Sequence, residues 1–231
     1  MIVHAISHKS MPDVRKLTMP ANSIKRRPDR RLGRTRARLG QALRKLMEER
    51  PLEKITVQNV IALAGVSRSA FYDHYNDKVD LLLSDMDEFL ERMAMLLVVK
   101  NEQSDRIAPA REFYGHVGEA VEIRAALAAS ERLQDFFDLA VEHFARGIEL
   151  RLKQIAAREK TQGRSGTDRR SDLIAHALAG AFIGFLNSWI RNGQRHTADT
   201  MDILFHELAW SGMKGVETRK LEQRTSSDRK R

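Results

Sequence analysis

The segment from Ile55 to Tyr75 combines two short helix patterns with polar side chains that can bind phosphate and base edges. Thr56 can cap the first helix through its hydroxyl, and Ser67 can cap the second. Gly65 can end the first helix in a left-handed conformation. Apolar residues recur at three- and four-residue spacing in both helices, which predicts an inward face. Such a pair of helices around a tight glycine turn is either a plain helical hairpin or a helix-turn-helix, whose second helix enters the DNA major groove.

The second of these helices leaves four side chains facing outward. Arg68 can fork onto the O6 and N7 atoms of guanine, or it can clamp a phosphate. Ser69 is small enough to read a base edge or to allow a close approach of the backbone. Tyr72 is a hydroxyl donor, whereas Asp73 repels phosphate and must accept from a cytosine amine or pair with a neighbouring cation. The residues alone leave each of these pairs of roles open.

Positive charge is concentrated at the N-terminal end of the chain. Of 40 basic residues, 11 lie within residues 1–38, where only two acidic residues occur, so this segment carries the whole formal net charge of +9. A basic run can be a solvated tail, but beside a helix-turn-helix it favours a cationic arm along DNA phosphates or in a minor groove. The 231 residues contain no cysteine, which excludes disulfides and thiolate metal sites.

These motifs together closely resemble the N-terminal domain of the TetR (tetracycline-repressor) family of regulators. The resemblance covers residues 34–83 and rests on Arg34–Leu39, Pro51–Val57, Ala64–Ser67, Phe71–Tyr75 and Asn76–Leu82. It implies phosphate contacts from Thr56, Tyr72, His74 and Lys78. The predicted DNA-binding residues are therefore Thr35, Thr56, Val57, Ser67, Arg68, Ser69, Tyr72, His74 and Lys78.

The remaining sequence predicts helices throughout, because no segment sustains the two-residue alternation of a strand. We expect an all-α fold with a three-helix helix-turn-helix domain and a helical effector-binding and dimerisation domain. The first helix is expected at 35–49, and a long helix at 77–99 would link the two domains. The predicted divisions are a disordered basic arm at 1–33, the DNA-binding domain at 34–76, the second domain at 77–215 and a disordered polar tail at 216–231. Met1, Met11 and Met19 are all possible starts.

Residues 173–190 are apolar on all sides and nearly long enough to span a membrane. His176, Asn187 and Ser188 interrupt the run, which favours a helix buried on several sides over a transmembrane helix. In the TetR family the last two helices of each subunit form the dimer. The segment from Trp189 to Gly193, followed by Thr197–Asp199, also resembles one TetR subgroup widespread in Firmicutes. The predicted dimer interface comprises Ala175, Ala179, Gly180, Ile183, Gly184, Met201, Leu204 and Leu208.

Aromatic and histidine side chains in the second domain are candidates to line an effector pocket, although apolar aromatics also build ordinary cores. They are Phe113, Tyr114, Phe137, His143, Phe144, His176 and Trp189. No motif of catalysis or of phosphate-loop binding occurs, so we predict no enzyme activity, no cofactor and no metal site. The N-terminus lacks the apolar core of a signal peptide, and a cytoplasmic location without a membrane partner is expected.

The sequence thus predicts a homodimeric regulator, most often a repressor in this family, that binds a palindromic double-stranded operator. Release would come from an unknown small-molecule effector in the second domain. Two alternatives remain at this point. The second domain could dock a partner protein in place of a small molecule, or the basic arm could make the chain a non-specific, nucleoid-type DNA binder.

Overall fold

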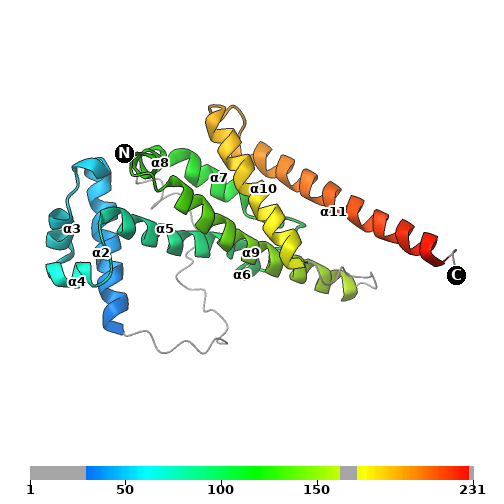
Figure 1. Ribbon diagram of the computed structural model, residues 1–231, viewed down its shortest axis with the longest axis horizontal. Coiled ribbons are helices and arrows are strands. Elements are labelled where there is room, and N and C mark those ends of the chain that lie inside the picture. The colour runs from blue at the N-terminus through cyan, green and yellow to red at the C-terminus, as the bar shows by residue number, and fades with distance from the viewer. Residues whose placement is uncertain (1–29, 162–170, 229–231) are drawn as a thin grey trace.

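The computed structural model describes the backbone of residues 30–161 and 171–228, and all regular elements in these ranges are helices (Figure 1). This confirms the predicted all-α fold. In chain order the elements are α2 (Arg30–Glu49), the 3-10 turn η2 (Leu52–Lys54), α3 (Val57–Ala64), α4 (Arg68–Tyr72), α5 (Lys78–Ala94), α6 (Leu96–Val99), α7 (Ala110–Glu119), α8 (Val121–Ala129), α9 (Leu133–Thr161), α10 (Ser171–Arg191) and α11 (Ala198–Asp228).

Helices α2, α3 and α4 with η2 form an N-terminal unit, at the left of Figure 1. Helix α2 packs on both α3 and α5, and an ion pair between Arg44 and Asp85 joins α2 to α5. The apolar face predicted from the spacing is buried: Leu39, Leu43, Val60, Ile61 and Phe71. These residues belong to one apolar cluster that continues through α5 into the rest of the molecule.

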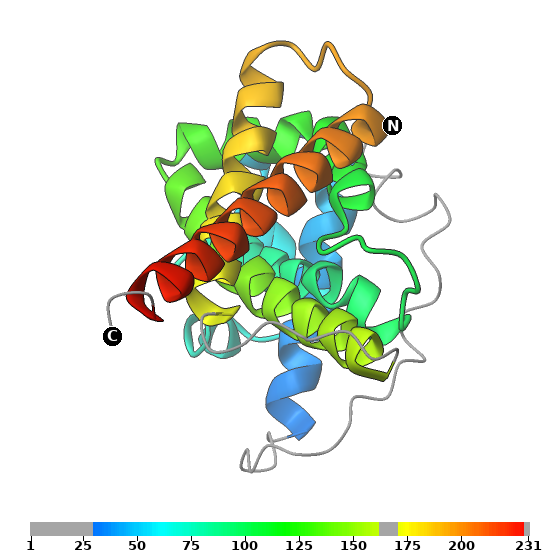
Figure 2. The same cartoon turned by 90° about the vertical axis from the view of Figure 1, so that its right-hand side faces the viewer.

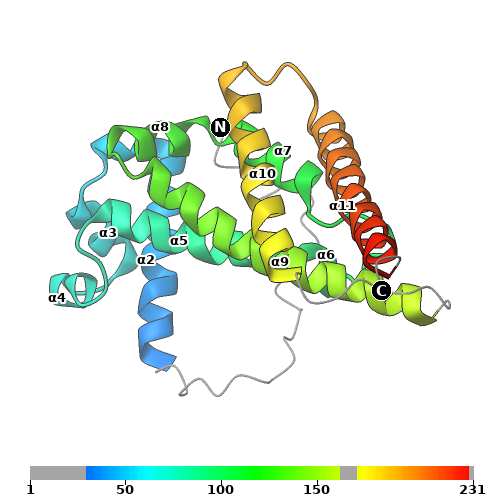
Figure 3. The same ribbon diagram turned by 45° about the vertical axis from the view of Figure 1, so that its right-hand side comes forward.

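Helices α6 to α11 form a C-terminal body around α9, which contacts α5, α6, α8 and α10 (Figure 3). The centre of the body is a cluster of aromatic rings from α7, α9, α10 and α11. The centroids of Phe113 and Phe144 are 4.6 Å apart, Phe144 lies 4.6 Å from Phe182, and Phe182 lies 5.2 Å from Phe205. Such offset and edge-to-face spacing is favourable and fills the space between the helices.

Helix α5 passes very close to α9 where Ala94 faces Gly147. A Cβ atom added at Gly147 would lie only 2.3 Å from the carbonyl oxygen of Ala94. The position therefore requires a glycine, because any side chain would push the two backbones apart. This contact fixes the position of α5 on α9. Helix α5 extends from the body to the N-terminal unit (Figure 1).

The boundaries of three predicted elements were wrong. The first helix begins at Arg30 and not at Thr35, so the end of the expected arm is helical. The long helix expected at 77–99 is divided at Met95 into α5 and α6. Helix α11 continues to Asp228, whereas the polar composition predicted a disordered tail from residue 216. Residues 1–29 of the predicted arm and residues 229–231 lie outside the described residues.

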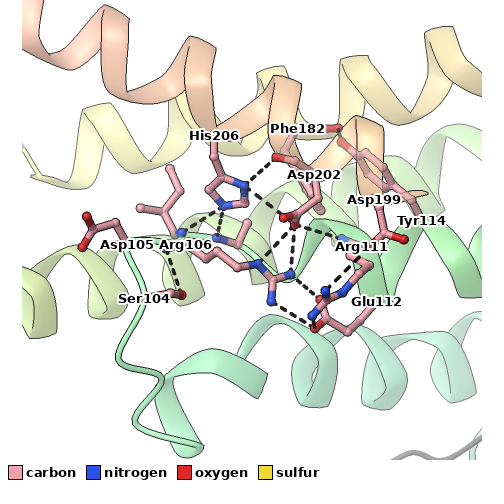
Figure 4. A network of polar contacts seen from close by, with 12 residues as sticks. Ser104, Asp105, Arg106, Arg111, Glu112, Tyr114, Phe182, Asp199, Asp202 and His206 are labelled. Carbon is pink, nitrogen blue, oxygen red and sulfur yellow. Dashed lines mark hydrogen bonds and ion pairs between the residues drawn. The ribbon is translucent and has the colours of Figure 1, made fainter. Parts of the chain in front are cut away.

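A polar network ties the segment between α6 and α7 to α11 (Figure 4). The guanidinium of Arg106 bonds both carboxylate oxygens of Glu112 on α7 and reaches Asp202 on α11 at 2.9 Å. Although burial opposes it, the hydrogen bond and charge of Arg106 lower the pKa of Glu112. Fully buried Arg151 on α9 supports the same segment by donating to the carbonyl oxygens of Arg106 and Ser104.

His206 on α11 is held as one neutral tautomer by its partners in this network. Its Nδ1 lies 2.7 Å from the carbonyl oxygen of Asp202, which only accepts, so Nδ1 carries the proton. Its Nε2 accepts from the backbone N–H groups of Ile107 at 3.0 Å and Ala108 at 3.4 Å. Protonation would place an N–H against two N–H donors, and burial accordingly lowers the pKa of His206 below its ordinary value of 6.5.

We predict opposite effects of alanine at two helical glycines. Gly147→Ala should lower the free energy of unfolding by about 1–3 kcal/mol, because the new Cβ meets the Ala94 carbonyl. Gly115→Ala in α7 should raise it by about 0.5–1 kcal/mol, because nothing lies within 4 Å of the added Cβ and alanine favours the helix. Urea unfolding of both variants measures the difference, and equal stabilities would contradict the close α5–α9 contact.

We also predict a stability loss in mild acid that depends on His206. The folded state holds this imidazole neutral, whereas the unfolded chain protonates it near pH 6.5. Its contribution to the free energy of unfolding should therefore be complete above about pH 7 and decline as the pH falls from there toward the lowered pKa of the folded state. His206→Gln keeps an acceptor for the two N–H groups without titrating, so its decline between pH 7.5 and 5.5 should be shallower. Parallel pH curves for the two proteins would contradict this account.

Candidate nucleic-acid interface

The turn between α3 and α4 is built as its sequence predicts. Thr56 caps α3 by accepting from Asn59 N at 3.1 Å, and the Asn59 side chain accepts from Thr56 N at 3.0 Å. Gly65 ends α3 with φ of 61°, a left-handed conformation that favours glycine. Ser67 then caps α4 by accepting from Ala70 N. Both helix starts therefore have defined positions on the surface of the N-terminal unit.

Arg38 supports this turn, a role that the sequence analysis missed. Its Nη2 donates to the carbonyl oxygen of Gly65 at 3.0 Å and so joins α2 to the end of α3. The sequence predicted Arg38 only as one of the basic residues of the N-terminal segment. Its position four residues before buried Ala42 places it on the side of α2 that packs against α3, and this spacing could have indicated the contact.

Three exposed side chains project from α4. Arg68 and Ser69 are exposed, and Tyr72 is 48% exposed. The Arg68 guanidinium lies 5.6 Å from the centre of the Tyr72 ring, a cation–π distance, and Ser69 Oγ lies 3.1 Å from Ser67 Oγ. Buried Phe71 anchors the same short helix from below. The predicted outward face is thus formed by neighbouring groups that suit both phosphate and base edges.

Three other predicted DNA-binding residues are placed less favourably. His74 is half-buried and lines a cleft of about 500 Å³ beside the body, together with Arg36 and Asp80. Thr35 is half-buried on α2, and Val57 packs partly against the core at the start of α3. Their roles in DNA contact stay predictions, and the cleft position of His74 does not support a phosphate contact.

Lys78 has a structural use that the resemblance did not predict. Its ammonium donates to the carbonyl oxygens of Leu52 and Ile55, both at 2.7 Å, and to that of Glu53 at 3.3 Å. These three acceptors occupy all three N–H donors of a lysine. The bonds join the start of α5 to η2 and to the residue before Thr56. The expected phosphate contact would have to compete with them.

Comparison with known families identifies this unit. Residues 41–84 match the sequence model described as "Bacterial regulatory proteins, tetR family". The match runs from α2 through α3 and α4 to the first part of α5 and includes the complete helix-turn-helix. The N-terminal unit is the DNA-binding domain of a TetR-family regulator. The chain is therefore a DNA-binding transcriptional regulator.

Several solved structures are similar to the chain at low sequence identity. A TetR-family regulator from Syntrophomonas wolfei is 18% identical over 78% of this chain and 94% of its own, with a TM-score of 0.48. One from Streptococcus agalactiae is 24% identical over 78% and 96%, with a TM-score of 0.44. The fatty acid degradation regulator FadR from Bacillus halodurans is 15% identical over 80% and 96%, with a TM-score of 0.47. No curated protein matches the sequence.

The predicted effector-pocket residues lie in different parts of the body. Phe113, Tyr114, Phe144 and Trp189 are buried in the packed aromatic cluster, where the Tyr114 hydroxyl donates to Phe182 O at 2.7 Å. Burial raises the pKa of Tyr114, which keeps that donor protonated. The others lie apart: Phe137 is partly buried beside Phe136, His143 pairs with Asp87 on α5 at 2.7 Å, and His176 is exposed. Ring packing fills the space around four of the seven residues, and their role in binding an effector stays a prediction.

Half of the predicted dimer interface faces the interior of the subunit. Ala175, Ala179 and Ile183 pack on α10's inward side and Met201 on that of α11, and each is at most 6% exposed. Gly180 and Gly184 are exposed, with no heavy atom within 4 Å of an added Cβ. Leu204 and Leu208 are also exposed, at 42% and 55%. Because α10 is apolar on all sides, its sequence does not indicate which side packs against the rest of the same subunit.

Two further properties can be read from the described residues. Helix Asp172–Arg191 is long and apolar enough to cross a membrane by length and composition, a test that core helices of soluble proteins also pass. Within residues 30–161 and 171–228, no three histidine, aspartate or glutamate side chains gather closely enough to hold a metal ion.

Substitutions at Tyr72 and Lys78 should separate a DNA contact from a structural one. Tyr72→Phe removes the exposed hydroxyl and should weaken binding to all duplex sequences by about three- to tenfold, with the fold unchanged. Lys78→Ala leaves three carbonyl oxygens without their donor and should lower the free energy of unfolding by about 1–3 kcal/mol. Binding titrations over a salt series and urea unfolding measure both effects. For Lys78, unchanged stability together with a fall of roughly 0.9 in the salt slope would favour the phosphate contact instead.

Proposed function

We propose that this regulator binds an inverted-repeat operator as a homodimer and represses transcription by occupying it. The observation that carries the proposal is the capped α3–Gly65–α4 turn, which presents Arg68, Ser69 and Tyr72 on one exposed helix. Helix-turn-helix proteins read DNA by placing such a second helix in the major groove. Because one five-residue helix reaches few base pairs, a second copy one helical turn away is needed for a specific site.

The reading groups in this proposal divide by chemistry. Arg68 is the group best suited to a guanine edge, because its planar fork matches O6 and N7. Tyr72, Ser67 and the backbone N–H groups at the starts of α3 and α4 are suited to phosphate oxygens. The basic segment before residue 38 would add sequence-independent attraction to the backbone.

The proposed dimer forms through the outer sides of α10 and α11. Figure 2 looks onto this side and shows α11 crossing in front of α10. Exposed apolar side chains gather here, and a hollow of about 380 Å³ lies between the two helices beside Phe185 and Leu208. The exposed members are Leu173, Gly180, Gly184, Ile203, Leu204 and Leu208. Exposed apolar residues on two adjacent helices are typical of an interface, and a twofold axis lets the same surface serve both subunits.

The C-terminal body is the part of the protein that would receive a signal. An effector that binds the body better in one conformation would shift the spacing of the two N-terminal units. Because the aromatic cluster is packed, we place no pocket within it. A body that docks a partner protein remains the second candidate, since the same exposed patch could receive another chain. In either case the chain would act in the cytoplasm without catalytic activity.

Selection from a random DNA pool tests this function, with a variant that tests the dimer. The wild type should enrich an inverted repeat and sediment as a dimer at micromolar concentration. Leu208→Glu places a carboxylate in the proposed interface and should give monomers that bind the selected duplex at least about tenfold more weakly. Val121→Glu, at a 51% exposed valine on α8, should change neither property. Enrichment of no sequence would contradict the operator, and a monomeric wild type would contradict the dimer.

A further inference from the structure

An arginine bridge connects the body to the first turn of α5, directly after the N-terminal unit. Arg132 lies in the turn between α8 and α9, and its Nη1 donates to Asp80 Oδ1 at 2.9 Å. Its Nε also bonds Asp135 in the first turn of α9, a contact that stays within the body. The hydrogen bond from Arg132 is the main cause that lowers the pKa of Asp80, which keeps this carboxylate charged.

The other oxygen of Asp80 holds the turn that follows α4. Asp80 Oδ2 accepts from the backbone N of Asn76 at 3.1 Å and from its Nδ2 at 2.7 Å. Asn76 lies between the last residue of α4, Tyr72, and the first residue of α5, Lys78. One carboxylate thus joins the α8–α9 turn to the segment that connects α4 to α5 through three hydrogen bonds.

The side chains of the bridge border an open cleft and are not enclosed by close packing. The cleft of about 500 Å³ between α9 and the N-terminal unit opens beside it, and Arg36, His74 and Leu139 line its walls. Helix α8 also packs against η2 of the N-terminal unit. This contact and the Arg132 bridge come from the same stretch, α8 and the turn that follows it. A displacement of this stretch would therefore reach both η2 and the start of α5.

We propose that Arg132 is a positioning residue for DNA recognition, which fixes α4 relative to the body through Asp80 and Asn76. The inference rests on the proposed function. It adds that the α8–α9 turn is the place where a change in the body is passed to the reading helix. The Arg132 and Asp80 side chains are 37% and 21% exposed, so the bridge is weak enough to break and reform. A contact of this strength suits a regulator whose two states differ little in free energy.

The test compares variants that break the bridge with one that does not. Arg132→Met removes the bridge, Asp80→Asn removes its charge but keeps an acceptor for Asn76, and Asp135→Asn removes only the contact within the body. We expect Arg132→Met to lower the ratio of affinities for the selected and a random duplex by about two- to fivefold. Arg132→Lys should restore part of this ratio. The ratio is the decisive readout, because a lost positive charge alone weakens both duplexes alike.

A double-mutant cycle shows whether Arg132 acts through Asp80. Adding Asp80→Asn to Arg132→Met should cause little further loss, because both changes break one bridge. Asp135→Asn should leave the ratio within about 1.5-fold of wild type. Equal losses from Arg132→Met and Asp135→Asn, or independent losses from Arg132→Met and Asp80→Asn, would overturn the proposal.

A distance measurement tests the bridge without DNA. Because the chain has no cysteine, spin labels can be placed at Gln58→Cys on α3 and Glu142→Cys on α9, both exposed. With labelled chains diluted in unlabelled protein, Arg132→Met should broaden the distance distribution and Asp135→Asn should not. An unchanged distribution would overturn the inference. If the wild type selects no DNA sequence, the proposed function fails, while this measurement still decides whether Arg132 orients the N-terminal unit.

Discussion

The close approach of α5 and α9 at Gly147 is the contact on which the other positions in the molecule depend. It holds one end of α5 against α9, the helix around which the body is built, with no side chain between the two backbones. The other end of α5 packs on α2 and is bonded through Lys78 to η2. Any rotation of α5 relative to α9 would therefore move α3 and α4 as well. The fold turns a helix–helix contact in the body into an orientation of the DNA-reading helix.

The body resists deformation in its centre and yields more readily at its edges. Its aromatic rings are packed at centroid distances near 5 Å, and Arg106 and Arg151 bind the segment between α6 and α7 to α9, α7 and α11. Close-packed interiors transmit small shifts instead of absorbing them. The cleft lined by His74 and Leu139 has no such filling, so relative movement of the two parts is expected there.

Local chemistry was readable from the sequence, whereas tertiary partners were not. Thr56, Gly65 and Ser67 act within one turn of their own helices, so their types and spacing sufficed to predict the caps and the helix-turn-helix. Lys78 and Arg38 bond carbonyl groups that are 23 to 27 residues away, which no local pattern reveals. The inward and outward sides of α10 were confused because both are apolar. Whether the proposed site residues contact DNA stays a prediction.

The stoichiometry of the protein on its selected duplex tests the central claim most directly. If the N-terminal units are paired by α10 and α11 and each is oriented by α5, native mass spectrometry of the full chain with that duplex should show two chains per DNA. The ratio should stay at two when neutral flanking sequence is added. One chain per duplex, or a number that rises with DNA length as for a non-specific binder, would contradict the account.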